Sequence, residues 1–369
     1  MSHPIGLVHD WLTGQRGGEN VLAAIARLFP AAPIYTLFHF PGSVAPAIES
    51  HPIVTSFLQR APALDPAYRW YLPLFPLAIE DLPVRDHRLV LSTSHCVAKG
   101  ARRGPGALHV CYCHTPMRYA WDQEAAYFGA RRGPVAALQR RVLAALRRWD
   151  VATAHRVDHY LANSSFVAGR IRRYYGRDAE VLPPPVDVEF FTPGSGPRGD
   201  HAVMVAALAP YKKVDAAIQA CERLGIPLVV VGEGPERARL ERLAGPTTRL
   251  AGRVSGAELR DLYRRAICFL QPGIEDFGIA AVEALACATP VVALAEGGVL
   301  DIVEEGRHGI LFRDPTAEGI GAAIDKVRSM EFNSVDLRGR AESFSADRFA
   351  HRLTELLISY WPDAEELLA

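Results

Sequence analysis

The chain of 369 residues is long enough to form two domains, each with a core of its own. Its 41 basic residues balance 41 acidic ones, which argues against a nucleic-acid-binding protein with a broad basic surface. No apolar run is long enough to span a membrane, and the first residues do not have the pattern of a signal peptide. The six scattered cysteines form no Cys-x-x-Cys pair, so we expect buried, reduced thiols in a cytoplasmic protein.

Short apolar runs alternate with helical patterns along the whole chain. They predict strands at 5–8, 89–91, 110–113 and 157–161, and again at 203–207, 228–231, 267–270 and 291–294. Alternating strands and helices are typical of parallel sheets with helices on both faces, whose ligands bind at the carboxyl ends of the strands. The sequence therefore predicts an α/β fold with two Rossmann-like domains.

A stretch rich in proline and glycine divides the chain into two halves. Residues 183–199 contain five prolines and three glycines, which is typical of an interdomain linker. We therefore expect a first domain at 1–187 and a second at 188–345. A helical stretch at 346–369 follows the second domain.

A glycine-rich loop follows the first predicted strand. It runs from Gly14 to Glu19 and contains Gly17 and Gly18 before a helical pattern. Glycines let the backbone approach a ligand closely, so this loop is a candidate binding element. The alternative is a turn that needs glycine only for a positive φ.

Polar and aromatic residues gather after the strand at 110–113, where the chain reads Cys-His-Thr-Pro-Met-Arg-Tyr-Ala-Trp-Asp from Cys113. Aromatic rings stack on sugars, and His and Arg bind hydroxyls and phosphates, so His114 is a candidate catalytic residue. His9 and His95 are further candidates. Asn163 and Ser164 follow the next strand, where a helix cap is the simpler interpretation.

Residues 134–149 form a basic amphipathic pattern. Its apolar stripe contains Val135, Leu138, Val142, Leu146 and Trp149, with arginines opposite. One interpretation is contact with anionic lipid or with a lipid-diphosphate acceptor. The alternative is a surface helix whose stripe packs on its own domain.

In the second half, Lys212 and Lys213 follow a predicted strand and precede a helix. A lysine at such a turn can neutralise a diphosphate, and a solvated surface pair is the alternative. A tight turn at 231–235 is more simply explained as a strand-to-helix connection.

Two glutamates, Glu275 and Glu283, flank the next strand-to-helix turn. The turn contains Phe277, Gly278 and Ile279, whose backbone N–H groups lie at the positive end of a helix dipole, where phosphate is favoured. Carboxylates beside a phosphate can accept hydrogen bonds from sugar or ribose hydroxyls. The alternative is a helix-starting glutamate and an exposed helical one.

This pair of glutamates resembles the motif of retaining glycosyltransferases of family 4, which have the GT-B fold of two Rossmann-like domains facing a cleft. The resemblance implies that Glu275 contacts the donor sugar and Glu283 the ribose. Lys212 matches the diphosphate-binding lysine of the family, and Ala207 stands where the family usually has an arginine.

Further segments resemble the family in the same order along the chain. Leu250 to Arg253 matches a segment that touches the nucleotide base, and Gly17 and Gly18 match the loop near the pyrophosphate. His114 matches the histidine at the donor sugar, and its surroundings resemble mannosyltransferases of bacterial polysaccharide and O-antigen assembly. The resemblance also implies that the terminal helix packs back on the first domain.

The expected activity is retaining transfer of a hexose, with GDP-mannose the favoured donor, to a saccharide or lipid-linked acceptor in surface polysaccharide biosynthesis. We expect no metal and no cofactor, since no Asp-x-Asp or spaced His cluster is present. The expected location is the cytoplasm, with peripheral contact at the inner face of the membrane through 134–149. The alternatives are a sugar-nucleotide epimerase-like enzyme and a non-catalytic nucleotide-sugar-binding protein.

Overall fold

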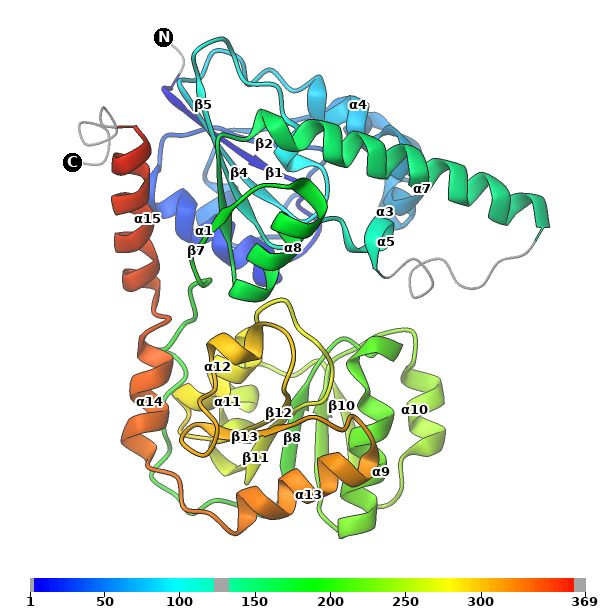
Figure 1. The fold of residues 1–369 in the computed structure, drawn as a ribbon, viewed down its shortest axis with the longest axis vertical. Coiled ribbons are helices and arrows are strands. Elements are labelled where there is room, and N and C mark those ends of the chain that lie inside the picture. The colour runs from blue at the N-terminus through cyan, green and yellow to red at the C-terminus, as the bar shows by residue number, and fades with distance from the viewer. Residues whose placement is uncertain (1–2, 123–132, 362–369) are drawn as a thin grey trace. The chain divides into compact units, whose positions relative to one another are not determined.

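The computed structural model describes residues 3–122 and 133–361 (Figure 1). The chain forms two compact units. The first contains Met1–Pro185 together with Phe349–Ala369, and the second contains Val186–Arg348. Each unit is a parallel sheet with helices on both faces, as the alternating pattern of the sequence predicts.

The sheet of the first unit has seven parallel strands in the order β3-β2-β1-β4-β5-β6-β7. Its central strands are buried along almost their whole length because both faces are covered. The strands are β1 (Ile5–His9), β2 (Ile34–Thr36), β3 (Ile53–Thr55), β4 (Leu89–Ser94), β5 (Leu108–Cys113), β6 (His159–Ala162) and β7 (Ala179–Val181).

Alternate residues of these strands point to two separate cores. Leu7, Leu91 and Tyr112 pack against α1, α2 and α15, whereas Val8 and Val90 pack against η2, α4 and α7. The helices of this unit are α1 (Gly17–Leu28), α2 (Pro46–Glu49), η1 (Phe57–Arg60), α3 (Leu64–Ala67), η2 (Tyr68–Leu74), α4 (Phe75–Glu80), η3 (Ala98–Gly100), α5 (Arg118–Trp121), α7 (Gly133–Thr153), η4 (Ala154–Arg156), α8 (Ser165–Tyr175) and α15 (Ala346–Tyr360).

The sheet of the second unit has six parallel strands in the order β10-β9-β8-β11-β12-β13. Its strands are β8 (Ala202–Val205), β9 (Leu228–Val231), β10 (Thr248–Gly252), β11 (Cys268–Gln271), β12 (Val291–Leu294) and β13 (Gly309–Phe312). One face packs against α9, α10 and α13, and the other against α11, α12 and α14. The helices are η5 (Pro210–Lys212), α9 (Val214–Leu224), α10 (Arg237–Leu243), α11 (Gly256–Arg265), α12 (Ile279–Ala286), η6 (Gly298–Asp301), α13 (Ala317–Arg328) and α14 (Ser334–Glu342).

The proline-rich stretch is not a loose linker throughout. The chain leaves the first unit after Pro185, and the side chains of Val186, Val188 and Phe191 are buried in the second core. The backbone N–H of Val186 donates to the carbonyl of Phe344, 2.9 Å away. The chain therefore joins the second unit at once. The exposed residues 193–199 are tied to this unit as well, because Arg198 donates to the carbonyl of Ala288 and the N–H of Gly199 donates to the carbonyl of Arg265.

The chain returns to the first unit through α15. Phe349, Leu353, Leu356 and Leu357 lie on one face of this helix, and all four are buried in the core of the first unit. Residues 362–369 of the predicted terminal segment lie outside the described residues.

Two further expectations concern the whole chain. All six cysteines are free and buried, as predicted. Within the described residues, no helix is both long and apolar enough to cross a membrane.

In each sheet the strand order reverses at one point, between β1 and β4 in the first unit and between β8 and β11 in the second. At such a point the loops leave in opposite directions and open a crevice at the carboxyl ends of the strands, where ligands of open α/β sheets bind. Apart from Arg253, which follows the edge strand β10, the predicted site residues follow these same four strands or their neighbours.

Candidate functional site

A buried aspartate organises the carboxyl end of the first sheet. Asp10 directly follows β1 and is fully buried. Its carboxylate accepts hydrogen bonds from the backbone N–H groups of residues 95–98, at 2.6 to 3.0 Å. The ring Nδ1 of His95 lies 3.0 Å from the same carboxylate. Asp10 therefore fixes the turn after β4, a role that the sequence pattern did not reveal.

The last residue of β1, His9, links this turn to the start of α1. Its Nδ1 lies 2.6 Å from Thr93 Oγ1, and its Nε2 lies 3.9 Å from Glu19 Oε1. Burial alone would raise the pKa of Glu19, but its contacts with His9 and the field of His95 outweigh burial and lower that pKa. Glu19 is therefore a buried carboxylate beside two imidazoles.

His114 follows β5 and is held by its backbone. Its N–H donates to the carbonyl of Ser94 at 2.8 Å, and its carbonyl accepts the side-chain amide of Asn163 at 3.0 Å. Its Nε2 is buried and has no hydrogen-bond partner among the described residues. Burial, together with the rings of His95 and His9, lowers the pKa of His114 well below its ordinary value. The neutral ring can therefore donate a hydrogen bond to a ligand hydroxyl or accept one from it at pH 7, according to its tautomer.

The predicted glycine-rich loop reaches these histidines. Gly17 and Gly18 are the first two residues of α1, so neither needs a positive φ, whereas Gly14 in the preceding loop has a φ of 153°. A Cβ on Gly18 would lie 3.6 Å from His114 Nε2 and 3.8 Å from His9 Cε1. The structure thus brings Gly18 and His114 together.

The helix-cap interpretation of the segment after β6 is confirmed, with one change. The hydroxyl of Ser164 caps α8 by accepting the N–H of Val167 at 3.1 Å. Asn163 instead orients the loop of His114.

In the second unit, Lys212 and Glu275 form an ion pair. Lys212 ends η5 after β8 and is only 8% exposed, and its Nζ donates to Glu275 Oε1. Lys213 is exposed and carries a φ of 56°. A Cβ on Gly273 would lie 2.7 Å from Lys212 Cα, so the loop after β11 runs directly along this turn. Two residues that the sequence predicts in one site therefore meet.

The turn between β11 and α12 presents the start of a helix. Gly278 caps α12 with a φ of 112°, which favours glycine. The first N–H groups of an α-helix have no partner inside the helix, so those of residues 278–280 can meet an anion. Gln271 ends β11, and its buried Nε2 has no hydrogen-bond partner among the described residues. A Cβ on Gly278 would lie 2.9 Å from Gln271 Oε1. Gln271 is a site candidate that the sequence alone did not suggest, because its strand position looks structural.

Glu283 lies in the second turn of α12 and is bonded to a buried tyrosine. Its Oε2 accepts the hydroxyl of Tyr263 at 2.9 Å, which leaves Oε1 to accept another hydrogen bond. Burial raises the pKa of Glu283 to about 7. A buried carboxyl with one open oxygen suits a ligand hydroxyl.

Three further predicted residues differ in their surroundings. The side chain of Phe277 is 4% exposed and packs against Phe344 in the core, so only its backbone can meet a ligand. Ile279 is partly buried against the same core. Arg253 is exposed after β10, and no hydrogen bond or ion pair of the described residues joins it to Lys212 or Glu275.

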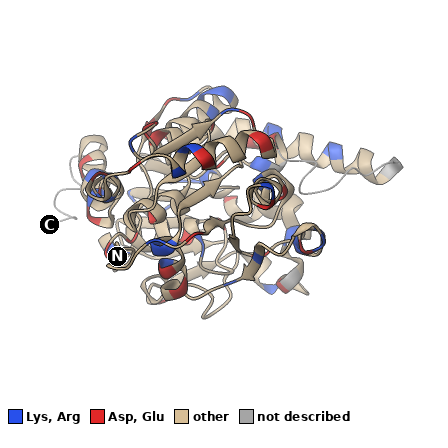
Figure 2. Ribbon diagram, turned by 90° about the horizontal axis from the view of Figure 1, so that it is seen from below, with Lys and Arg blue, Asp and Glu red and all other residues tan. Residues whose placement is uncertain are grey.

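The predicted basic helix is α7, and the alternative in which its apolar stripe packs on its own domain holds for only part of the stripe. Val135 and Leu138 are 57% and 63% exposed, whereas Leu143 and Leu146 are buried. Figure 1 shows that the first turns of α7 project beyond the other described helices of the first unit. Figure 2 shows basic residues along this helix, and acidic and basic residues interspersed over the remaining ribbon.

No group of three or more His, Cys, Asp or Glu side chains is placed to hold a metal ion in the part of the chain that the structure describes.

Comparison with known proteins adds independent information. A family model described as "Glycosyltransferase Family 4" matches residues 16–190, and one described as "Glycosyl transferases group 1" matches residues 188–344. A D-inositol 3-phosphate glycosyltransferase of Geodermatophilus obscurus is 32% identical over 246 residues, 58% of this chain and 54% of the relative. One from Kribbella flavida is 30% identical over 246 residues, 58% of each protein. The chain thus spans little more than half the length of these curated relatives.

Solved structures resemble the fold over almost the full chain. The Anabaena protein HepE in complex with UDP-glucose has a TM-score of 0.71 at 16% identity, covering 97% of this chain and 100% of that one. A sucrose-phosphate synthase from Thermosynechococcus elongatus has a TM-score of 0.70 at 16% identity, covering 97% and 99%. At this identity the likeness concerns the fold, whereas the two family models together extend from residue 16 to residue 344. The chain belongs to the family 4 glycosyltransferases.

Proposed function

We propose that this chain transfers a hexose from a nucleoside-diphosphate sugar to a saccharide or lipid-linked saccharide acceptor. The observation that carries the proposal is the ion pair of Lys212 and Glu275 beside the start of α12. It gathers a cation, a hydroxyl acceptor and helix amides, the groups that a diphosphate attached to a sugar requires.

Each residue then has a distinct task. Phosphate oxygens compete with Glu275 for the ammonium group of Lys212, and the released carboxylate accepts a hydroxyl of the donor sugar. The open oxygen of Glu283 accepts a ribose hydroxyl. The neutral ring of His114, in the first unit, is suited to a hydrogen bond with a sugar hydroxyl.

In the reaction, the bond between the anomeric carbon and the diphosphate oxygen breaks, and the acceptor hydroxyl oxygen bonds to that carbon. The hydroxyl proton passes to the leaving diphosphate. Negative charge develops on that diphosphate, so Lys212 and the amides of α12 stabilise the transition state more than the ground state. We propose retention of configuration and assign no protein nucleophile.

Mannose from GDP-mannose, used in surface polysaccharide biosynthesis, is the donor that we favour. It is supported by the likeness of the segment from Cys113 to Asp122 to mannosyltransferases of polysaccharide assembly. UDP-glucose is the competing donor, because the Anabaena relative is described in complex with it.

Binding and transfer decide between these donors. Thermal unfolding is measured with UDP, GDP, UDP-glucose and GDP-mannose, since a ligand at 100 times its Kd stabilises the folded protein by about 2.7 kcal/mol. We expect the largest shift with GDP-mannose and transfer of labelled mannose to a lipid-linked acceptor. A larger shift with UDP-glucose would replace the donor, and no shift with any of the four would overturn the proposed function.

We propose that transfer needs no metal ion and no separate cofactor. Lys212 and the α12 amides supply the positive charge that a metal would otherwise provide. Transfer should therefore survive excess EDTA. Complete loss of transfer that magnesium or manganese restores would contradict this proposal.

We also propose a cytoplasmic location with α7 at the inner face of the membrane. The exposed apolar side chains of Val135 and Leu138 precede Arg140 and Arg141, which suits an anionic bilayer surface. Replacing both apolar residues by serine should weaken cosedimentation with anionic vesicles. Val335→Ser is the matched control, because Val335 is 78% exposed in the second unit. Equal binding by all variants would exclude α7 as the contact.

A further inference from the structure

An open pocket of about 500 Å³ lies in the first unit, away from the residues discussed above. Four arginines line it: Arg85, Arg102, Arg103 and Arg156. They precede β4, β5 and β6, so they lie at the amino ends of these strands, whereas His114 and Asp10 follow the carboxyl ends. The pocket is therefore separate from the candidate active site.

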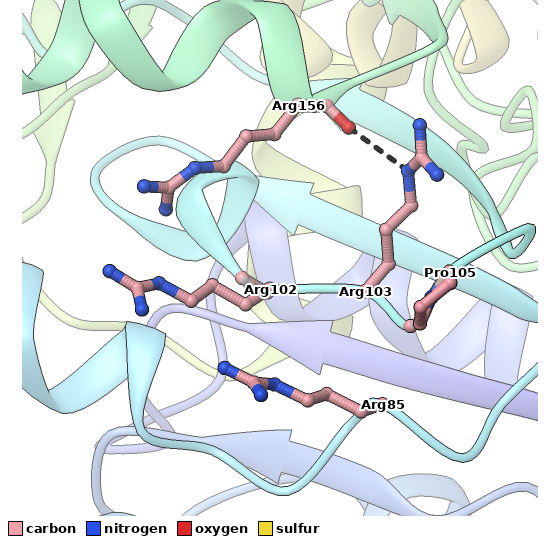
Figure 3. A pocket seen from close by; sticks show the side chains of 7 residues that line it. Arg85, Arg102, Arg103, Pro105 and Arg156 are labelled. Carbon is pink, nitrogen blue, oxygen red and sulfur yellow. Dashed lines mark hydrogen bonds between the residues drawn. The ribbon is translucent and has the colours of Figure 1, made fainter.

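The arginines are arranged to meet one ligand. Figure 3 shows the guanidinium groups of Arg85, Arg102 and Arg156 pointing toward the same side, from three different segments. Arg103 points the other way, and its Nε donates to the carbonyl of Arg156 at 3.4 Å. Three planar cations on one side of a pocket match a group with several anionic oxygens.

The positive charge of the pocket is only partly balanced. Glu80 pairs with Arg102 and with Arg156, the latter at 2.7 Å, and Asp158 pairs with Arg103 at 2.8 Å. Arg85 is exposed and has no ion-pair or hydrogen-bond partner among the described residues. Four guanidinium groups thus share two carboxylates, although the chain as a whole is neutral.

The backbone around the pocket is fixed before any ligand binds. A Cβ on Gly104 would lie 2.1 Å from the carbonyl oxygen of Arg85, so the two segments touch and only glycine fits there. Arg156 also donates to the carbonyl of Gly100 at 2.8 Å. A ligand would therefore find Arg102 and Arg156 already held by Glu80 and Gly100, which lowers the entropic cost of binding.

We propose that this pocket binds a phosphate-bearing ligand, a phosphomonoester or a diphosphate, at a site distinct from the donor site. Two unbalanced positive charges match a dianion, and the guanidinium forks match phosphate oxygens. The same chemistry is offered by a soluble phosphate compound and by a lipid headgroup with a terminal phosphate.

The test uses the full chain and the variant Arg85→Gln, since Arg85 holds no other residue in place. Binding of inorganic pyrophosphate is measured by calorimetry for the wild type, Arg85→Gln, Arg328→Gln and Lys212→Ala. Arg328→Gln is the matched control, an exposed arginine of the second unit. Loss of one charged contact should weaken pyrophosphate at the pocket about tenfold or more in Arg85→Gln only.

Lys212→Ala separates this proposal from the proposed function, because it removes pyrophosphate from the donor site and leaves the pocket intact. The proposed phosphate site would be wrong if Arg85→Gln left pyrophosphate binding unchanged. It would also be wrong if Lys212→Ala abolished pyrophosphate binding completely. Flotation with phosphatidylcholine vesicles, with and without phosphatidic acid, identifies the source. If flotation requires both phosphatidic acid and Arg85, the ligand is a lipid headgroup. If the protein binds pyrophosphate but does not float with phosphatidic acid, the ligand is a soluble phosphate compound.

Discussion

At the scale of single residues, the two neighbouring lysines have opposite environments. Lys212 is buried and paired with Glu275, whereas Lys213 is exposed. Lys212→Ala should lower the rate of transfer by about 10² or more, because a cation is lost where charge develops. Lys213→Ala is the matched control and should change the rate much less. Equal, mild effects of both substitutions on kcat would remove Lys212 from the diphosphate site.

The two glutamates should separate in their effects on binding and turnover. Glu275→Gln removes the charge that holds Lys212, so the bare nucleoside diphosphate should bind as well as before or more tightly, while transfer falls. Calorimetry and the transfer rate measure these two effects. Weak nucleotide binding with normal transfer would exchange the assigned roles.

Glu283→Ala should weaken nucleoside diphosphate binding by about 1–3 kcal/mol, since a buried acceptor is lost from a ribose hydroxyl. The control is chemical, because a 2′,3′-dideoxynucleotide lacks those hydroxyls. Its affinity should be nearly the same for the wild type and Glu283→Ala. An equal loss with both nucleotides would place Glu283 away from the ribose.

At the scale of the elements, the turn before α12 depends on its glycine. Gly278→Ala would place a Cβ 2.9 Å from Gln271 Oε1 at a φ of 112°. We expect a loss of stability of about 1–3 kcal/mol and weaker nucleotide binding, because the start of α12 must shift. Gly339→Ala is the matched control, since its Cβ would meet nothing within 4 Å. Thermal unfolding that is equal for both variants would contradict this account.

The elements show which local signals are sufficient for prediction. All eight predicted strands exist, because runs such as Leu228–Val231 are buried on both faces and read as continuous apolar segments. The sequence analysis missed β2, β3 and β7, which have three residues each, β10, which is only half-buried, and the edge strand β13. A three-residue run is too short to show a period, so its pairing partner decides its structure.

The candidate site follows the same logic. The placement of Lys212, Glu275 and His114 after the carboxyl ends of strands was predictable, because each follows a strand that is a strong apolar run. Asp10 and Gln271 were not predictable as site residues. Asp10 acts through backbone amides of the turn after β4, and Gln271 through the turn at Gly278, and only the fold brings these turns near them. The exposed positions of Val135 and Leu138 depend on where the neighbouring core ends, which helical periodicity does not encode.

At the scale of the whole molecule, buried ionisable groups couple stability to pH. Burial lowers the pKa of His95, His109 and His114, that of His109 to about 3. Below pH 6.5 these histidines bind protons in the unfolded chain but not in the folded chain. The free energy of unfolding therefore decreases as the pH is lowered. Glu283 acts in the opposite direction, because its pKa of about 7 gives stability that is present below pH 4.5 and lost as pH rises through 7. Because three histidines act in one direction and one glutamate in the other, we expect a net decrease in the free energy of unfolding as the pH is lowered from 6.5 to 4.5.

His109→Gln tests this balance. The His109 ring is fully buried, with its Nε2 2.8 Å from Ser92 Oγ, and glutamine keeps a polar group there that cannot be protonated. The wild type should lose thermal stability from pH 7 to pH 5, and the variant should lose less. The difference should be at most about 1.4 kcal/mol per pH unit, the contribution of a single proton. Glu283→Gln should instead make the loss of stability toward acid steeper, since it removes a group that opposes this loss. If the unfolding midpoints of the wild type and His109→Gln decrease in parallel from pH 7 to pH 5, His109 is protonated in the folded protein. The assignment of a neutral, buried His109 would then be wrong.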